Sequence, residues 1–163
     1  MELKKRIMIV SDTHRHLDNL KLALARELPI DGLIHCGDVE GQEKDIARLA
    51  GCPVYIVRGN NDFFTDLPRE REEFLFGKRI MITHGHNYGV SLDLSLLRDE
   101  AAVRGVDICF FGHTHRPVIE QGSGVTIVNP GSLSFPRQAD HKPTYIMMTI
   151  DRTGNAEFTL KTL

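Results

Sequence analysis

The chain has 163 residues, of which 41% are hydrophobic and 26% are charged, and its formal net charge is −2. A chain of this length can bury a core of its own, and its nearly balanced charge argues against a strongly basic surface for sequence-specific nucleic-acid binding. No apolar run approaches the roughly 18 residues that a membrane span needs. We therefore expect a single domain over residues 1–163, with no membrane association.

The start of the chain and its cysteines indicate a cytoplasmic protein. Charged residues between Glu2 and Arg6 lead directly into an apolar run, without the apolar region and small-residue cleavage site of a signal peptide. Cys36, Cys52 and Cys109 are odd in number and widely spaced, which is typical of reduced thiols rather than of a disulfide framework.

The first part of the chain predicts strands that alternate with helices. Residues 6–11, 31–36 and 53–57 are short apolar runs, the pattern of strands covered on both faces in a parallel sheet. A helix is expected over 43–50, and another helix precedes the second strand, where leucines recur at helical spacing. These leucines are Leu17, Leu20, Leu24 and Leu28. The order is βαβαβ.

The second part predicts a hairpin, one helix and several short strands. Residues 73–76 and 79–83 read as a hairpin with Gly77-Lys78 as its turn. A helix is expected over 92–104 and a strand over 107–111. Four more strands, expected to be antiparallel, follow at residues 118–120, 125–128, 144–150 and 156–161. The two halves of the chain would then form two packed sheets flanked by helices.

Polar residues follow five of the predicted strands. They are Ser11 to His14, Gly37-Asp38, Gly59 to Asp62, Thr83 to His86 and Gly112 to His115. Loops at the carboxyl ends of strands in an α/β sheet converge on one crevice, so the five groups can share a pocket.

Such a pocket calls for metal ions. Two ionised carboxylates about 4 Å apart repel by roughly 4 kcal/mol at an effective dielectric constant of ~20, and the motifs contain no lysine or arginine to offset this. The mixed nitrogen and oxygen donors suit manganese, iron, cobalt, nickel or zinc better than calcium or magnesium. The donors exceed what one ion needs, which indicates two ions that share a carboxylate. The candidates are Asp12, His14, Asp38, Asn60, His84, His113 and His115.

Each motif also has a structural interpretation. An isolated D-x-H or G-D at the end of a strand is more often a helix cap or a turn, and only the coincidence of five such groups favours a metal site. His35, next to Cys36, is expected to be a packed strand residue, whereas His16 and His141 are expected to face solvent.

The ordered motifs D-x-H, G-D, G-N-x-D, T-H-G and G-H-x-H resemble those of the calcineurin-like metallophosphoesterases. The stretch Asn129 to Ser132 adds a similarity to their small YfcE-type phosphodiesterase branch, and the resemblance extends from about Arg6 to Tyr145. It implies an α/β fold in the form of a four-layer αββα sandwich, with two mixed sheets flanked by helices.

The resemblance also implies a distribution of the ligands over two metal ions. Manganese is the expected ion, with iron, nickel, cobalt or zinc as alternatives. The first ion would be held by Asp12, His14, Asp38 and His115, and the second by Asp38, Asn60, His84 and His113, with Asp38 bridging. Thr114 would face away, and Gly112 would let the backbone approach the cluster.

A site of this kind predicts hydrolysis of a phosphate ester by a metal-bridging hydroxide, without a serine or cysteine nucleophile. Many members of the wider family place a histidine near the leaving group where this chain has Asn61. Asparagine can donate a hydrogen bond but cannot act as a general acid, whose loss costs about 10²–10⁴ in rate. We therefore expect a small-molecule or nucleotide phosphodiester as substrate.

Four residues are candidates for the remaining roles. Asn61, Asp62 and His86 are candidate catalytic residues, and Asn61 and Arg137 are candidate substrate-binding residues. Each of the last three has an alternative. Asp62 could orient the Asn60-Asn61 turn or cap the next segment, His86 could support a metal ligand, and Arg137 could be a solvated loop charge.

Two other functions remain open. A similar fold serves in the small subunit of retromer as a protein-interaction scaffold that has lost part of the ligand set, whereas every ligand position is intact here. A phosphomonoesterase or protein phosphatase of the same family is the third possibility, disfavoured by Asn61 and by the small size of the chain. Relatives also suggest a homodimer or homotetramer.

Overall fold

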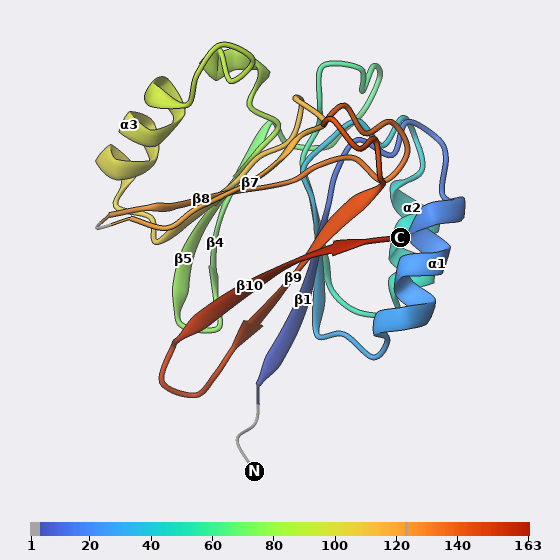
Figure 1. The fold of residues 1–163 in the computed structure, drawn as a ribbon, viewed down its shortest axis with the longest axis horizontal. Coiled ribbons are helices and arrows are strands. Elements are labelled where there is room, and N and C mark those ends of the chain that lie inside the picture. Colours follow the sequence, from blue (N-terminus) through green and yellow to red (C-terminus); the bar gives the residue numbers. More distant parts are fainter. Residues whose placement is uncertain (1–3, 123) are drawn as a thin grey trace.

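The structure is a computed structural model that describes residues 4–122 and 124–163. Figure 1 shows two sheets in the middle of the molecule, with α1 and α2 beside one of them and α3 beside the other. The elements in chain order are β1 (Lys5–Val10), α1 (Asp18–Glu27), β2 (Gly32–His35), α2 (Glu43–Ala50), β3 (Val54–Ile56), β4 (Glu70–Leu75), β5 (Lys78–Thr83), the 3₁₀-helix η1 (His86–Tyr88), α3 (Ser95–Arg104), β6 (Ile108–Phe110), β7 (Pro117–Glu120), β8 (Thr126–Pro130), β9 (Thr144–Ile150) and β10 (Ala156–Thr162).

The two sheets are both mixed and five-stranded. The first has the order β10-β9-β1-β2-β3, and the second has the order β4-β5-β6-β8-β7. In the first, β1, β2 and β3 are parallel, as the βαβαβ pattern predicts, while β9 and β10 are antiparallel to their neighbours. The α/β sandwich of two mixed sheets flanked by helices is confirmed.

Alternation along β1 explains how the first sheet is covered on both faces. Met8 and Val10 pack with the buried side chains of α1 and α2, whereas Ile7 and Ile9 pack against the second sheet. All four are at most 1% exposed. Successive residues of a strand point to opposite faces, so a continuous apolar run fills two separate cores.

The second sheet repeats this arrangement. Ile80 and Ile82 of β5 face the first sheet, and Met81 between them packs against Leu97 and Ala101 of α3. Three hydrophobic cores therefore separate four layers.

The hairpin of β4 and β5 is longer than predicted and turns one residue earlier. Glu70 pairs with Thr83 and Leu75 pairs with Lys78, so the turn is Phe76-Gly77 rather than Gly77-Lys78. Phe76 and Gly77 have φ angles of 53° and 80°. Positive φ at both central residues is typical of a type I′ turn, in which glycine commonly takes the second central position.

Helix α3 begins at Ser95, three residues after the predicted start at Leu92. The carboxylate of Asp93 accepts hydrogen bonds from the backbone N–H and the hydroxyl of Ser95, which fixes a turn immediately before the helix. Leu92 is 91% exposed, so its apolar character does not mark a buried helix face.

The last four strands pair with one another in antiparallel fashion, as predicted, but the assignment of one sheet to each half of the chain is wrong. β8 runs parallel to β6 and antiparallel to β7. β9 pairs with β1, with Ile146 opposite Ile9, so the C-terminal hairpin belongs to the first sheet. Local sequence specifies a strand and its buried faces but not its partner, which depends on the faces that meet in the fold.

Over residues 4–122 and 124–163, no helix combines the length and hydropathy that crossing a bilayer requires. Cys36 and Cys109 are buried and Cys52 is half-buried, and all three are free thiols.

Candidate metal centre

The predicted ligands meet at one edge of the sandwich, in the loops that follow β1, β2, β3, β5 and β6. Five of the seven have positive φ angles, a conformation that is uncommon outside glycine and clusters at functional sites. These five are Asp12 (54°), His14 (46°), Asp38 (63°), His113 (70°) and His115 (58°). The loops thus hold these residues in backbone conformations that a free chain would seldom adopt.

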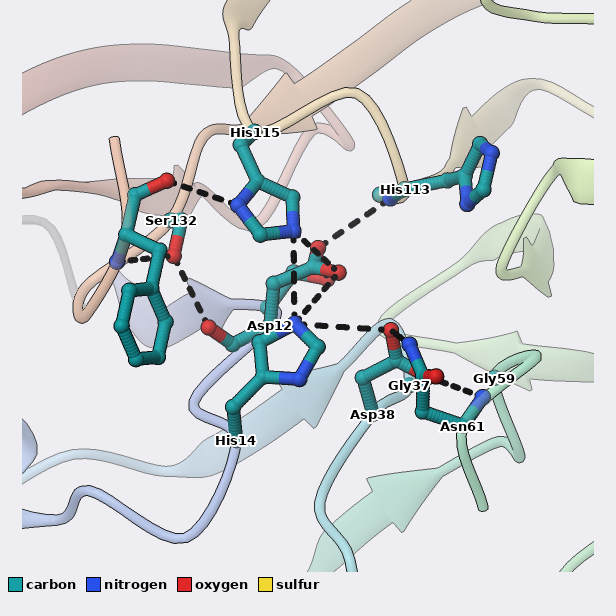
Figure 2. Close-up of polar contacts among 12 residues, drawn as sticks. Asp12, His14, Gly37, Asp38, Gly59, Asn61, His113, His115 and Ser132 are labelled. Carbon is teal, nitrogen blue, oxygen red and sulfur yellow. Dashed lines mark hydrogen bonds and ion pairs between the residues drawn. The ribbon is translucent and has the colours of Figure 1, made fainter. Parts of the chain in front are cut away.

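Asp12 is the centre of the cluster (Figure 2). Its Oδ2 atom accepts hydrogen bonds from the Ser11 hydroxyl at 2.5 Å and from the His113 backbone N–H at 3.1 Å. Its Oδ1 atom is buried and has no hydrogen-bond partner in the part of the chain that the structure describes. Oδ1 instead faces Nε2 atoms of His115 at 3.2 Å, His14 at 3.7 Å and His84 at 3.8 Å.

Backbone carbonyls orient two of the imidazoles. The Nδ1–H of His84 donates to the Cys36 carbonyl at 2.7 Å, and the Nδ1–H of His115 donates to the Phe135 carbonyl at 2.7 Å. Each ring therefore turns its Nε2 atom toward Asp12. Partners of this kind fix the tautomer and orientation of metal-binding histidines.

The other two imidazoles point inward as well. His14 lies with Nδ1 3.4 Å from a Glu40 carboxylate oxygen and Nε2 3.3 Å from Nε2 of His115. The Nδ1 atom of His113 lies 3.1 Å from the side-chain oxygen of Asn60 and 3.3 Å from Nε2 of His84. Two imidazole nitrogens this close repel unless a proton or another cation lies between them.

The charges of the cluster depend on one another. Burial would raise the pKa of Asp12, but the imidazoles of His115, His14 and His84 outweigh burial and hold this pKa well below its ordinary value. Burial would lower the pKa of His84, but the Asp38 and Asp12 carboxylates raise it to about 9. The two ionised carboxylates thus draw a proton onto a buried imidazole, which supplies the positive charge that a divalent ion would otherwise supply.

These donors fit a site for divalent metal ions. Among the described residues, the ligand atoms of Asp12, His14 and His115 lie within 4.8 Å of one another. The same holds for those of Asp12, Asp38 and His84. Both groups contain Asp12, whereas Asp38 is the predicted bridge. Asp38 also reaches both, since its Oδ2 atom lies 3.5 Å from Nε2 of His14 and 3.4 Å from Nε2 of His84.

Two glycines make room for the carboxylates. A Cβ atom at Gly112 would lie 2.1 Å from the Ser11 hydroxyl and 2.7 Å from Oδ2 of Asp12. A Cβ atom at Gly59 would lie 2.1 Å from Oδ1 of Asp38. Glycine is needed at both positions because the carboxylates occupy the space of a side chain.

Asn61 and Asp62 lie against the Asp38 loop. The backbone N–H and side-chain amide of Asn61 donate to the two carboxylate oxygens of Asp38, at 2.9 and 3.0 Å. The carboxylate of Asp62 is 4% exposed and accepts hydrogen bonds from the backbone N–H groups of Asp38, Glu40 and Gly59, at 2.6 to 2.8 Å. Both side chains hold Asp38 in position.

His86 lies beside His84, and Arg137 lies near His14 and His115. The ring of His86 is 5.5 Å from that of His84, and its Nδ1 atom is buried without a hydrogen-bond partner among the described residues. Burial and, next, the charge of His84 lower the pKa of His86. Arg137 lines a hollow of about 450 Å³ with His14, His115 and Phe135.

Several residues that contact the cluster lie outside the five motifs and were not predicted as site residues. Phe135 acts through its carbonyl on His115 and through its ring, 5.5 Å from that of His14 in an edge-on contact. Glu40 faces His14, and the Ser132 hydroxyl donates to the Asp12 carbonyl at 2.8 Å. The stretch Asn129 to Ser132 thus contacts two of the ligand loops, since the Asn129 side chain also donates to the Gly112 carbonyl at 3.0 Å.

The remaining histidines lie as predicted. His35 is fully buried, and His16 and His141 are exposed. Thr114 turns its hydroxyl toward the Asn129 side chain, which donates to it at 3.0 Å, and so faces away from the cluster.

Comparison with known proteins gives matches over nearly the whole chain. A family model described as a calcineurin-like phosphoesterase superfamily domain matches residues 6–153. The chain is 32% identical over 146 residues to probable metallophosphoesterase YsnB of Bacillus subtilis, covering 89% of this chain and 84% of that protein. It is 30% identical over 146 residues to phosphodiesterase MJ0936 of Methanocaldococcus jannaschii, covering 77% and 82%.

Solved structures share the fold. A crystal structure from Streptococcus pneumoniae, described as a predicted phosphoesterase, has a TM-score of 0.79 and 22% identity, with 100% of both chains covered. Vacuolar protein sorting 29 from Cryptosporidium parvum has a TM-score of 0.78 and 20% identity, with 99% of both chains covered. At these identities the likeness concerns the fold alone.

Proposed function

Because the chain belongs to the calcineurin-like phosphoesterase superfamily, as its motifs predict, we propose that it is a phosphodiesterase that uses two divalent transition-metal ions. Its substrates would be small-molecule or nucleotide phosphodiesters. The observation that carries the proposal is the unpartnered Oδ1 atom of Asp12, buried and surrounded by three imidazole nitrogens within 3.8 Å. A buried carboxylate oxygen without a hydrogen bond is costly unless a cation binds it.

We propose the ligand sets that the family resemblance implies. Asp12, His14, Asp38 and His115 would hold one ion, and Asp38, Asn60, His84 and His113 would hold the other. The distances of Asp38 from His14 and His84 support its place between the two sets. Manganese is the expected ion, and iron, cobalt, nickel and zinc suit the same donors. When bound, such ions would lower the pKa of a water molecule, so that hydroxide is available near neutral pH to attack phosphorus. They would also supply positive charge for the phosphoryl oxygens.

The remaining side chains would position the ligands and the substrate. Asn61 has its amide engaged with Asp38, which leaves it poorly placed to donate to a leaving group. His86, whose Nδ1 atom has no partner among the described residues, is better placed to form that hydrogen bond. Because asparagine at position 61 cannot act as a general acid, esters whose leaving group departs readily are favoured, such as diesters of nucleosides or aryl alcohols.

A scaffold function is the second candidate, because the vacuolar protein sorting 29 structures share this fold. The complete set of inward-pointing donors weighs against it. A cluster retained only for packing would leave buried charges to be offset at several kcal/mol. A phosphomonoesterase is the third candidate. A reducing compartment such as the cytoplasm would suit the three free thiols.

One experiment separates the three candidates. The chain would be purified with manganese, analysed for metal content, and assayed on bis(p-nitrophenyl) phosphate and p-nitrophenyl phosphate. Bound metal with faster cleavage of the diester supports the proposal, and faster cleavage of the monoester supports a phosphatase. Full metal occupancy without cleavage of either compound supports the scaffold.

A further inference from the structure

A second cavity, of about 460 Å³, lies next to the candidate metal centre. Its walls come from the loop before α3 and from the loop between β6 and β7. The volume lies within the range of cavities that hold a drug-sized ligand or a cofactor. None of the seven predicted metal ligands is among its lining residues.

The cavity borders the loop that carries His113 and His115, and it shares Arg137 with the hollow beside His14. Thr114, which lines it, lies in the chain between His113 and His115. Arg137 lines both this cavity and the hollow beside His14, and its backbone N–H donates to the His115 carbonyl at 3.0 Å. A molecule that has a phosphate at the centre could therefore extend one arm past Arg137 into the cavity.

The polar side of the cavity is positively charged. Arg116 and Arg137 are both exposed, and neither forms an ion pair with any residue of the described ranges. The single carboxylate in the lining, Asp93, is already engaged by the N–H and hydroxyl of Ser95. Two guanidinium groups beside one occupied carboxylate leave a net positive charge for a ligand.

Apolar side chains make up much of the remaining lining. Val90, Leu92, Phe111 and Val118 contribute to it. The Val90 and Phe111 side chains also lie behind Gly85, where an added Cβ would be within 3.3 Å of both, so this wall is continuous with the loop that carries His84. A lining that combines apolar side chains with two arginines suits a ligand with a flat or aliphatic body and an anionic end.

We propose that this cavity binds the second ester arm of the substrate, and that it selects arms that end in a phosphate or carboxylate. The inference rests on the proposed phosphodiesterase function and narrows its substrate class to diesters with a second anionic group, such as nucleotide derivatives. Guanidinium groups bind phosphate and carboxylate through paired, charge-assisted hydrogen bonds. A neutral arm would leave Arg116 and Arg137 without a partner.

The test compares two diesters with the same leaving group. Thymidine 5′-(p-nitrophenyl phosphate) and its 3′-phosphorylated form differ only in the second anion. We expect a KM at least about 10-fold lower for the 3′-phosphorylated form, with similar kcat, because one charge-assisted contact contributes about that factor. Arg116→Gln should abolish the difference and Arg116→Lys should restore part of it.

Binding without turnover provides the second readout. Thymidine 3′,5′-bisphosphate should bind at least about 10-fold more tightly than thymidine 5′-phosphate in calorimetry, and Arg116→Gln should bind both alike. The matched control is Arg152→Gln, which removes a positive charge from the turn between β9 and β10. This turn follows Ile150, which pairs with Lys5 at the start of β1, whereas the metal ligands follow the end of β1.

The outcomes distinguish the two proposals. If the active enzyme had equal KM values for the two diesters and equal affinities for the two nucleotides, the role of the cavity would be refuted. The proposed phosphodiesterase function would stand. Selective binding of the bisphosphate without hydrolysis of any diester would support the anion-binding role of the cavity and refute the phosphodiesterase function. Loss of selectivity in Arg152→Gln as well would show a general charge effect and also overturn the cavity.

Discussion

The Nε2 atom of His115 lies 3.2 Å from Oδ1 of Asp12, yet this oxygen has no hydrogen bond to any residue that the structure describes. His115 cannot donate from Nε2 in its neutral form, because its proton is on Nδ1 and is bound to the Phe135 carbonyl. In that form, two lone pairs would face each other inside the fold. A cation between them would offset their repulsion.

Replacement of Asp12 by asparagine should remove metal binding. The substitution keeps the shape of the side chain but removes its charge, so we expect metal affinity to fall by at least about 100-fold, the upper range for loss of an outer partner. Metal content after dialysis, measured by elemental analysis, checks this. Glu157→Gln on β10 is the control. Retention of a full metal load by Asp12→Asn would contradict the assigned role.

Replacement of Gly112 by alanine should displace Asp12. The new methyl group would lie 2.1 Å from the Ser11 hydroxyl and 2.7 Å from the Asp12 carboxylate, so one of them must move. We expect a loss of about 1–3 kcal/mol in the free energy of unfolding, together with weakened metal binding. Gly122→Ala is the matched control, since an added Cβ there meets nothing within 4 Å. Equal behaviour of the two variants in urea unfolding and metal titration would refute the steric argument.

Replacement of Asp62 by alanine should act on stability first. Three backbone N–H groups that donate to its carboxylate would lose their acceptor, and we expect a cost of roughly 3 kcal/mol or more in the free energy of unfolding. The pH profile of kcat/KM should keep its shape in the residual activity, because Asp62 holds Asp38 rather than transferring a proton. If one limb of the profile disappeared while stability stayed unchanged, Asp62 would be a proton-transfer group.

His35 should make the fold less stable in acid. Its Nδ1 atom accepts the Gly37 N–H at 3.0 Å, its Nε2 atom lies 3.0 Å from the Thr13 hydroxyl, and burial lowers its pKa from 6.5 to about 4. The His35 ring therefore becomes protonated near pH 6.5 in the unfolded chain, but only near pH 4 in the folded chain. Stability due to His35 is complete above pH 6.5 and falls by roughly 2 kcal/mol by pH 5.

Urea unfolding at pH 7.5 and 5.0 checks this prediction on the wild type and His35→Gln. The variant should be less stable at pH 7.5, because a buried ring is lost, but its further loss at pH 5.0 should be smaller by about 2 kcal/mol. The metal ligands titrate in both proteins, so the comparison cancels their contribution. Identical pH dependence in the two proteins would exclude His35 as the source.

The layers could be predicted from the sequence because each strand has its own pattern of apolar residues. The run from Arg6 to Ser11 indicates a strand with two buried faces, and the structure places Ile7 and Met8 in different cores. The pairing of β9 with β1 could not be predicted, since the partner of a strand is decided by surfaces far apart in the chain. The start of α3 was missed because Asp93 fixes a turn where apolar residues suggested a helix.

The candidate site could be located for a related reason. Its residues follow strands directly, so strand prediction places them at one edge. The contributions of Phe135 and Glu40 could not be read in this way. Phe135 acts on His115 through a carbonyl that every residue possesses, and Glu40 acts on His14 through a loop conformation. Such roles depend on tertiary position rather than on residue type.

The place of β9 in the first sheet also has a consequence for biosynthesis. The seven candidate ligands lie between Asp12 and His115, whereas the strand that pairs with the free edge of β1 spans Thr144–Ile150. A ribosome therefore exposes the whole ligand set before it delivers the strand that completes the sheet beneath Asp12. A nascent chain shorter than this has an open edge and imidazoles free to bind ions in other combinations. We therefore expect correct ion loading to follow the synthesis of β9.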